Sequence, residues 1–197
     1  MTKSERTRQF IVSRTAEIFN KQGYQGTSLS DLETATGLTK GSLYGNFSDK
    51  QEIAREAFRY SMEQIRSVVR DRINKKKTAR DKLLALISFH ADYVFNPPIA
   101  GGCPLLNTAI EADDCNPLMK KAVAAEIQKT IDAIAELLES GKKNGEFVRS
   151  FKSQELAVVF FTGFEGALMM SRVAGSDKAM KIVVKHCKSL LDQIAAK

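Results

Sequence analysis

Cysteine and histidine, the residues from which disulfide frameworks and many metal sites are built, are scarce in this chain of 197 residues. The three cysteines, Cys103, Cys115 and Cys187, are odd in number and form no CxxC pair, so we expect reduced thiols rather than disulfides. The two histidines, His90 and His186, lie far apart in the chain and begin no recognised ligand pattern. We therefore expect no metal and no other cofactor.

Long hydrophobic runs are also missing. No stretch of about 18 apolar residues is free of charge, and the first ten residues, MTKSERTRQF, are polar, unlike a signal sequence. Apolar residues make up 43% and charged residues 27% of the chain, which is an ordinary globular composition with enough apolar material for a core. We expect a soluble, cytoplasmic protein without a membrane partner.

Proline is confined to one region, because all four prolines fall between residues 97 and 117. Elsewhere apolar residues recur at helical spacing, and no segment has the alternation of a strand hairpin. The pattern predicts an all-α fold whose helices are interrupted near the prolines. The expected helices are 4–22, two turns after Ser28, a short helix from Thr39, 50–74, 81–95, 104–113, 117–141, 153–173 and 176–195.

The first three expected helices have the order and the turns of a helix-turn-helix. Ser28 and Asp31 form a capping-box pattern at the start of the second helix. Gly37 follows the end of that helix, and Thr39 is a suitable N-cap for the third. The third helix is therefore expected to begin directly after a tight turn.

Two glycines, Gly41 and Gly45, lie inside the short third helix, in TGLTKGSLYGNFSDK. A glycine in a helix interior costs about 1 kcal/mol relative to alanine. A helix selected for stability alone would not carry two of them. We infer that something approaches this backbone closely.

The charge of the chain is unevenly divided. Residues 1–82 carry 17 Lys and Arg against 10 Asp and Glu, whereas residues 83–197 carry 13 of each. The whole net charge of +7 therefore belongs to the first part. A polyanion such as double-stranded DNA is the natural partner for this asymmetry, and a solvated basic surface is the alternative.

Together these features predict that the third helix recognises DNA. Lys40 at the helix start can reach guanine acceptors or phosphate, and the missing side chains at Gly41 and Gly45 allow a close approach. Neutral donors for phosphates and one further charge come from Thr39, Ser42, Tyr44 and Lys50. The alternative is a surface helix with a solvated polar face.

The stretch TSLSDLETATGLTKGSLYGNFSDKQEIAREAF resembles the N-terminal DNA-binding signature of the tetracycline-repressor (TetR/AcrR) family of bacterial transcriptional regulators. The resemblance covers residues 6–58 and rests on the Lys-Gly pair, the Tyr-x-x-Phe and the following Lys. It implies base contacts from Thr39, Lys40 and Gly41, phosphate contacts from Thr27, Tyr44, Asn46 and Lys50, and a core position for Phe47. Gly45 and Asn46 depart from the common family pattern, so the operator sequence is not inherited from the resemblance.

Residues 156–170, LAVVFFTGFEGALMM, are apolar almost all the way round. A helix without a polar face needs partners on both sides, so we expect one side to face a second subunit. The resemblance likewise implies a two-fold homodimer built from the last two helices, and a monomeric bundle is the alternative. The expected interface residues are Gly163, Gly166, Ala167, Ile182 and Leu190.

Aromatic residues in the second half suggest a pocket for a small-molecule effector, although such side chains are more often ordinary core. Cys103 follows two glycines and precedes a proline, where a helix N-terminus would favour a reactive thiolate, and a buried inert cysteine is the alternative. The lone carboxylate Glu165 could recognise a ligand or pair with Arg172 or a residue across the interface. The candidate pocket residues are Phe89, His90, Tyr93, Cys103, Phe161, Phe164 and Glu165.

We therefore predict a ligand-responsive repressor that a small effector releases from a near-palindromic operator. Residues 1–49 are assigned to the helix-turn-helix domain, which continues into the connecting helix 50–74. Residues 75–197 are assigned to a helical effector-binding and dimerisation domain. From another class of function, the alternative is a small cysteine-dependent enzyme using Cys103 with His90, but nothing in the sequence orients that pair.

Overall fold

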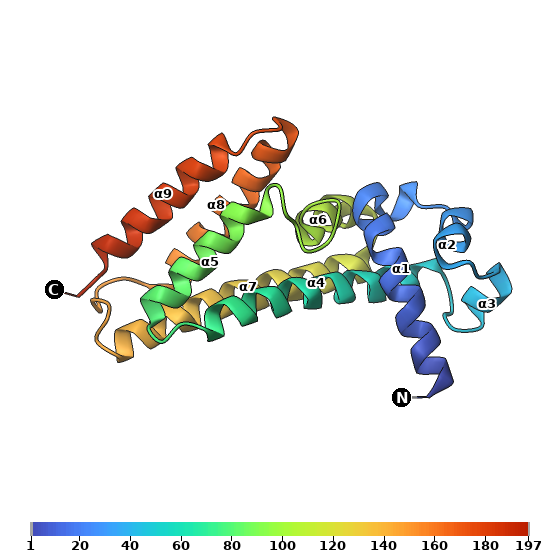
Figure 1. Ribbon diagram of the computed structural model, residues 1–197, viewed down its shortest axis with the longest axis horizontal. Coiled ribbons are helices and arrows are strands. Elements are labelled where there is room, and N and C mark those ends of the chain that lie inside the picture. Colours follow the sequence, from blue (N-terminus) through green and yellow to red (C-terminus); the bar gives the residue numbers. More distant parts are fainter. Residues whose placement is uncertain (1, 197) are drawn as a thin grey trace. The chain divides into compact units, whose positions relative to one another are not determined.

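The computed structural model describes residues 2–196, apart from the side chain of Cys115. Within these residues every named element is a helix, which confirms the predicted all-α fold (Figure 1). The helices are α1 (Lys3–Gly26), α2 (Leu29–Thr36), α3 (Lys40–Tyr44), α4 (Lys50–Asn74), α5 (Ala79–Tyr93), α6 (Pro104–Cys115), α7 (Pro117–Lys143), α8 (Ser153–Val173) and α9 (Lys178–Gln193).

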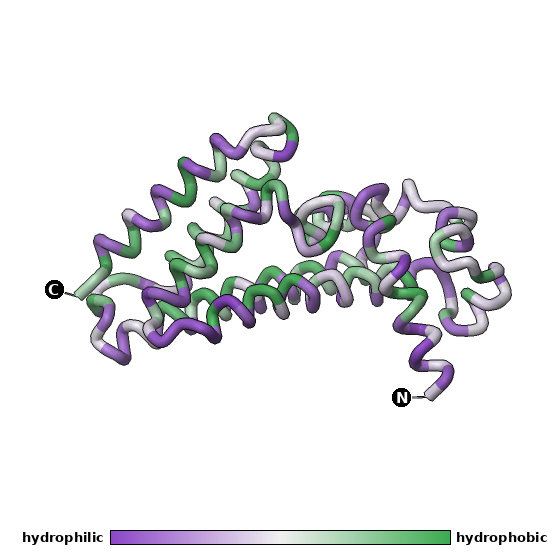
Figure 2. The backbone as a smooth tube through the Cα atoms, in the orientation of Figure 1, coloured by the Kyte–Doolittle hydropathy of each residue, from purple (hydrophilic) through white to green (hydrophobic). Residues whose placement is uncertain are grey.

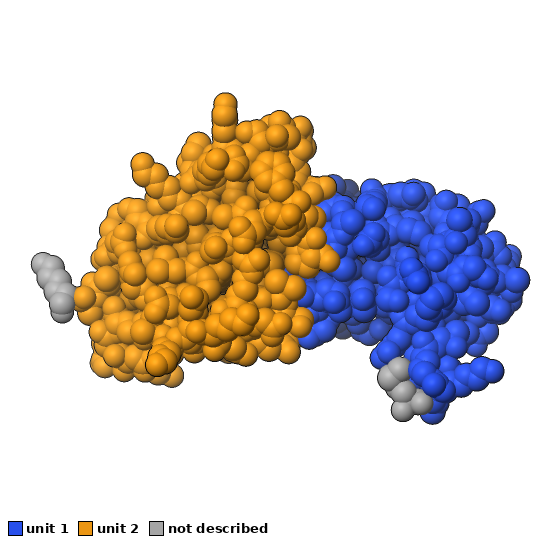
Figure 3. All heavy atoms as spheres, viewed as in Figure 1, with its two compact units in different colours: residues 1–65, 99–124 blue, residues 66–98, 125–197 orange. Residues whose placement is uncertain are grey.

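The chain forms two compact units, coloured separately in Figure 3. The first unit comprises the chain up to Ile65 together with Ile99–Ala124, and the second comprises Arg66–Pro98 and the chain from Ala125 onward. This grouping differs from the expected domain boundary after residue 74, because α6 belongs to the same compact unit as the first three helices. The boundary between functional domains remains a prediction.

The first unit is built on a small apolar core. Ile11, Leu32, Leu43, Phe47 and Ile53 come from α1, α2, α3, the following loop and α4, and all five are buried. Figure 2 shows apolar and polar residues alternating along these helices, as expected for helices with one face toward a core. The core position implied for Phe47 is confirmed.

Helix α6 is joined to α1 by polar contacts. The side-chain amide of Asn20 donates to the carbonyl oxygens of Ala100 and Gly102, both at 2.9 Å. Asn107 on α6 donates in turn to the carbonyl oxygen of Asn20 at 3.0 Å. Gly101 has φ +108°, and a Cβ there would lie 2.9 Å from that same carbonyl oxygen, so the approach requires glycine.

A second set of contacts fixes the end of α1, where Gly23 has φ +74° and interrupts the helix. The carboxylate of Glu111 on α6 accepts hydrogen bonds from the backbone N–H groups of Tyr24 and Gln25, each at 2.6 Å. A Cβ at Gly23 would lie 2.7 Å from that carboxylate. The segment after the prolines is therefore an integral part of the first unit.

In the second unit, α8 packs against α9 and α5, and α5 packs against α9. The buried side chains Leu83, Ile87, Phe160, Phe164 and Leu191 form the interior of these contacts. Among residues 2–196, α8 is the one helix that is both long enough and apolar enough to cross a membrane. Core helices of soluble proteins meet the same criterion, so this feature does not by itself indicate a membrane.

Candidate nucleic-acid interface

The turn between α2 and α3 has the geometry of a helix-turn-helix. The predicted capping box is present, because Asp31 N–H donates to the Ser28 hydroxyl and Ser28 N–H donates to the Asp31 carboxylate. Gly37 has φ +67° and donates its N–H to the carbonyl oxygen of Glu33 at 2.8 Å. Thr39 caps α3 by accepting from the N–H of Ser42 at 3.3 Å. With Leu43 buried below, α3 presents its other faces outward.

The exposed face of α3 collects most of the residues predicted to contact DNA. Thr39, Lys40, Gly41, Ser42 and Tyr44 are all exposed. Because they lie close together on one short helix and its N-cap, a small surface presents two hydroxyls, a phenol and a lysine. Such a set can donate to phosphates and to acceptors on base edges.

The fold itself restricts the two glycines of this region, Gly41 and Gly45, to different degrees. A Cβ added to Gly41 would find only the Thr39 hydroxyl oxygen nearby, at 3.9 Å, so the fold itself has room for a side chain. A Cβ at Gly45 would lie 3.1 Å from the carbonyl oxygen of Gly41, which is a tight contact. Packing within the protein therefore explains glycine at position 45. At position 41 it does not, so the explanation for Gly41 must lie outside the chain.

Three of the predicted phosphate-contacting residues are engaged within the protein. Thr27 is buried and donates its hydroxyl to the carbonyl oxygen of Gly23 at 2.6 Å. The Lys50 ammonium donates to the carbonyl oxygens of Tyr24 and Thr27, both at 2.7 Å, and lies 4.2 Å from the centre of the Tyr24 ring. Thr27 and Lys50 thus hold the connection between α1 and α2.

Asn46 is also engaged, because its side-chain amide donates to the carbonyl oxygen of Ser42 at 2.9 Å and so closes the end of α3. Its side chain is half-buried, in contrast to the exposed side chain of Tyr44. The predicted DNA contacts therefore divide into an exposed group on α3 and a group that supports it.

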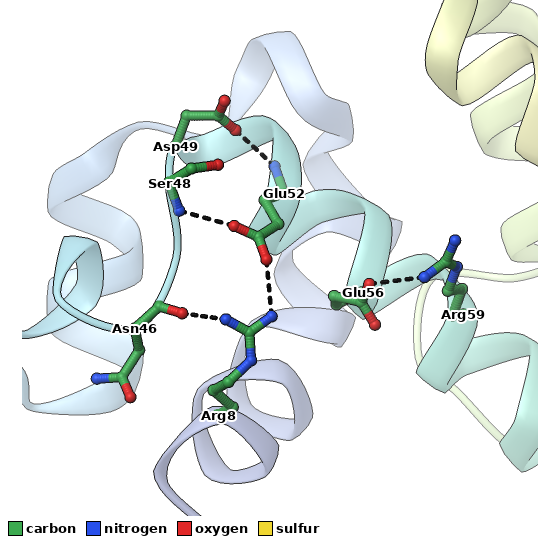
Figure 4. Close-up of polar contacts among 7 residues, drawn as sticks. All are labelled: Arg8, Asn46, Ser48, Asp49, Glu52, Glu56 and Arg59. Carbon is green, nitrogen blue, oxygen red and sulfur yellow. Dashed lines mark hydrogen bonds and ion pairs between the residues drawn. The ribbon is translucent and has the colours of Figure 1, made fainter. Parts of the chain in front are cut away.

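The sequence analysis missed Arg8 and Glu52, which meet beside the loop formed by residues 45–49, here called the α3–α4 loop (Figure 4). Arg8 Nη2 and Glu52 Oε1 are 2.7 Å apart, and Arg8 Nη1 donates to the carbonyl oxygen of Asn46. Arg8 and Glu52 are 44 residues apart in the chain, so no local sequence pattern indicates the pair. Hydrogen bonds from Arg8 and from the Ser48 N–H lower the pKa of Glu52 to about 2.

In the second unit, four of the predicted effector-pocket residues come together. The His90 ring stacks on Phe164 with 4.0 Å between ring centres, and Phe89 meets both His90 and Tyr93 edge-on. His90 Nδ1 lies 2.9 Å from the carbonyl oxygen of Leu86, and burial lowers the pKa of His90 to about 4. The rings contact one another directly, as they do in an apolar core.

Of the remaining predicted pocket residues, Phe161 and Glu165 belong to the same compact unit as these rings, whereas Cys103 does not. Cys103 belongs to the first unit, where it is buried at the N-cap of α6. Phe161 and Glu165 lie on α8 and are partly buried, with the Oε2 atom of Glu165 fully covered. The composition of an effector pocket remains a prediction.

The predicted interface residues on α8 point in different directions. A Cβ at Gly163 would lie 3.2 Å from Val183 on α9, and Ala167 is buried, so both positions serve packing within one chain. A Cβ at Gly166 would meet nothing within 4 Å. Leu190 is half-buried, whereas Ile182 is 70% exposed.

Gly166 lies among exposed apolar side chains that the sequence analysis did not select. We call this set, together with Gly166 and Ile182, the α8–α9 apolar surface. Helical spacing places the α8 members on one face of that helix. Its other members are Val158, Val159, Met169, Met170 and Val173, all of them exposed.

Comparison with known proteins gives the same two-part division of the chain. The model for "Bacterial regulatory proteins, tetR family" matches residues 11–57, and the model for "Tetracyclin repressor-like, C-terminal domain" matches residues 79–187. The second match alone spans more than half of the chain. The chain belongs to the TetR family of bacterial transcriptional regulators.

Individual relatives extend over nearly the full length. A TetR-family transcriptional regulator from Cytophaga hutchinsonii is 34% identical, with 100% of this chain and 98% of that chain covered and a TM-score of 0.95. The repressor NemR of Escherichia coli is 22% identical over 94% of each chain. A cysteine mutant of the regulator CifR, solved with a 26-bp operator duplex, shares the fold at 22% identity, with 92% of this chain and 94% of that chain covered and a TM-score of 0.80.

These findings confirm the predicted class of function, a DNA-binding helix-turn-helix regulator of transcription. They give no support to the alternative of a cysteine-dependent enzyme that uses Cys103 and His90. Proteins of this family are typically transcriptional regulators rather than enzymes.

Proposed function

We propose that the protein is a cytoplasmic repressor that binds a near-palindromic operator as a homodimer and leaves it when a small molecule binds the second unit. The observation that carries the proposal is Gly41, an exposed glycine beside Lys40 for which the fold itself supplies no steric reason. Related proteins support it, since NemR is named a repressor and CifR is described with operator DNA.

On the DNA side, we assign base contacts to Thr39, Lys40 and Gly41, which begin α3. Ser42 and Tyr44 would donate to phosphates, because both are exposed and carry neutral donors. Asn46, Thr27 and Lys50 would act mainly by holding the backbone on which that surface is built. The Lys50 ammonium, with three N–H groups, retains one donor for a phosphate.

The homodimer would form through the α8–α9 apolar surface. Monomeric proteins rarely leave a contiguous apolar patch of this kind in water, and a two-fold partner would cover it with the same patch. Two copies of α3 on one face of a duplex require a fixed separation of about 34–36 Å or a multiple of it. An effector would act by changing that separation.

The effector would enter the second unit beside the aromatic cluster of Phe89, His90, Tyr93 and Phe164. A neutral imidazole stacked among rings favours a flat, apolar ligand over a strongly charged one. Phe161 and Glu165, which lie on α8 in the same unit, remain candidates for further contacts.

The test is to incubate the purified protein with fragments of its own genome and to sequence the DNA that it retains. We expect enrichment of a near-palindromic site, with affinity that falls steeply as salt rises, because several phosphates per subunit would be contacted. Retention without a common sequence would refute the assignment of an operator-binding repressor.

A further inference from the structure

Helix α3 has only five residues, which is far too few for a helix to be stable by itself. Its orientation must therefore be set by the buried side chain of Leu43 and by what holds its two ends. At the N-terminal end, the N–H of Lys40 donates to the carboxylate of Glu33 at 2.6 Å. At the C-terminal end, α3 runs directly into the α3–α4 loop, so the position of this loop helps to set where α3 points.

The Arg8–Glu52 pair contacts three consecutive residues of that loop, and Figure 4 shows its hydrogen bonds to Asn46 and Ser48. Arg8 donates to the carbonyl oxygen of Asn46, and its guanidinium lies 4.0 Å from the centre of the Phe47 ring. The second oxygen of Glu52 accepts from the N–H of Ser48 at 2.7 Å. One pair, with one member on α1 and one on α4, thereby fixes the whole path from Asn46 to Ser48.

This pair differs from an ordinary surface ion pair. Its side chains are 36% and 21% exposed, and the guanidinium, carboxylate and loop backbone satisfy one another. The nearby pair of Arg59 and Glu56, one turn further along α4, is 59% and 31% exposed and lies three residues apart on the same helix. Exposed pairs of that second kind usually contribute little.

We infer that Arg8 and Glu52 are positioning residues for DNA recognition, which set the orientation of α3 through the α3–α4 loop. The inference rests on the proposed function, because it concerns binding to the operator. Recognition groups act only if supporting contacts hold them in place, and a loop that is free to shift would misplace Lys40 and its neighbours.

A change at Glu52 separates this role from simple electrostatics. Glu52→Gln removes a negative charge from the DNA-binding unit, so electrostatics alone would tighten binding to every DNA. A positioning role requires the opposite for the operator, because the neutral amide can no longer accept strongly from both Arg8 and Ser48. The sign of the effect is therefore decisive.

The experiment measures affinities of the full-length protein for two duplexes. One is a fragment selected by the wild type from a random-sequence library, and the other is a scrambled duplex of the same composition. Glu56→Gln is the matched control, because it removes the same charge from the same helix without touching the loop. Helix content and thermal unfolding are recorded for each variant.

We expect Glu56→Gln to bind both duplexes as tightly as the wild type, or slightly more tightly. For Glu52→Gln we expect about 10-fold weaker binding or more to the selected duplex, which is the loss of one charge-assisted hydrogen bond, and no loss on the scrambled duplex. Equal behaviour of the two variants would overturn the inference, as would an equal loss on both duplexes, since general destabilisation has no sequence preference.

If Glu52→Gln unfolds at the assay temperature, Arg8→Lys takes its place. Lysine keeps the charge but lacks the planar fork that reaches Asn46 and Glu52 together, so the same selective loss is expected. Full operator affinity in Arg8→Lys would contradict the inference. A wild type that enriches no sequence from the library would refute the proposed function instead, which keeps the two failures distinct.

Discussion

Both compact units have buried apolar side chains, but the contacts around α3 in the first unit differ in kind from those between α5 and α8 in the second. Around α3 in the first unit, hydrogen bonds and ion pairs cross between α1, α4 and the α3–α4 loop. In the second unit, α5 and α8 meet through the stacked rings of His90 and Phe164, and Phe89 meets His90 edge-on within α5. The difference indicates that a small polar surface needs directional contacts to hold its shape, whereas a larger helical bundle can rely on apolar packing.

The strongest test of this contrast is to place a charge on the second unit's apolar surface. Gly166→Arg puts a guanidinium at an open position on α8, so the fold of one chain should persist while the proposed dimer separates. We expect operator affinity to fall about 100-fold or more as two-site binding is lost. Light scattering measures the separation of the subunits, and circular dichroism measures whether the helices persist.

Val148→Arg is the control, because Val148 is also an exposed apolar residue but lies outside α8 and α9. It should leave the dimer intact. A wild type that is monomeric at micromolar concentration would contradict the assignment of the α8–α9 apolar surface as the interface.

Acid should weaken the second unit before it weakens the Arg8–Glu52 pair. Folding lowers the pKa of His90 from 6.5 to about 4. The contribution of neutral His90 to stability is therefore complete above pH 6.5 and is lost as the pH falls through 4. That loss amounts to about 3 kcal/mol over the window. The pKa of Glu52 falls from 4.5 to about 2 on folding, so its contribution is present above 4.5 and is lost only as the pH falls toward 2.

Denaturant unfolding of the wild type and of His90→Phe at several pH values between 7 and 4 tests this order. Phenylalanine retains a ring beside Phe164 but has no proton to gain. The variant should therefore show a flatter dependence on pH. An identical slope in both proteins would mean that His90 is not responsible.

Lys40→Ala tests the exposed surface of α3 in the first unit. The Lys40 side chain is exposed on α3, so its loss should leave stability unchanged. We expect discrimination at one position of the half-site to relax by roughly 1–3 kcal/mol. Binding measured on operator and random duplexes decides the point, and an equal loss on both would assign Lys40 to phosphate rather than to a base.

The smallest expected effect distinguishes the two glycines. Gly41→Ala should keep or raise stability, by up to about 1 kcal/mol from helix propensity, while it weakens operator binding. Gly45→Ala should lower stability, because its Cβ would press on the carbonyl oxygen of Gly41. Thermal unfolding gives the direction of each stability change, and binding measurements give the change in operator affinity. Unchanged affinity in Gly41→Ala would remove the main support for a close approach of DNA at that position.

Local patterns predicted the parts of the fold that depend on residues close together in the chain. The Ser28 capping box, the Gly37 turn and the Thr39 cap each involve partners within four residues, and all three are present. The exposed group on α3 follows from the same short stretch. Such features are legible in a sequence because their partners lie in the same turn or the next.

Contacts between distant residues could not be predicted in this way. Arg8 and Glu52 are 44 residues apart, and Glu111 lies 87 residues from Tyr24. A lysine such as Lys50 looks the same in a sequence whether it faces a phosphate or two carbonyl oxygens within the protein. On α8, which is apolar almost all round, periodicity could not tell the face toward α9 from the open face that holds Gly166.

The docking of Ile99–Ala124 onto α1 has a consequence for how this regulator can be divided. A DNA-reading module cut after residue 74 would omit Asn107 and Glu111, leaving the side-chain oxygen of Asn20 and the N–H groups of Tyr24 and Gln25 without these partners. The transferable piece is therefore discontinuous in the gene. A chimera that gives the proposed operator contacts to another sensor must carry two separate stretches of coding sequence, rejoined by a linker where α5 now intervenes.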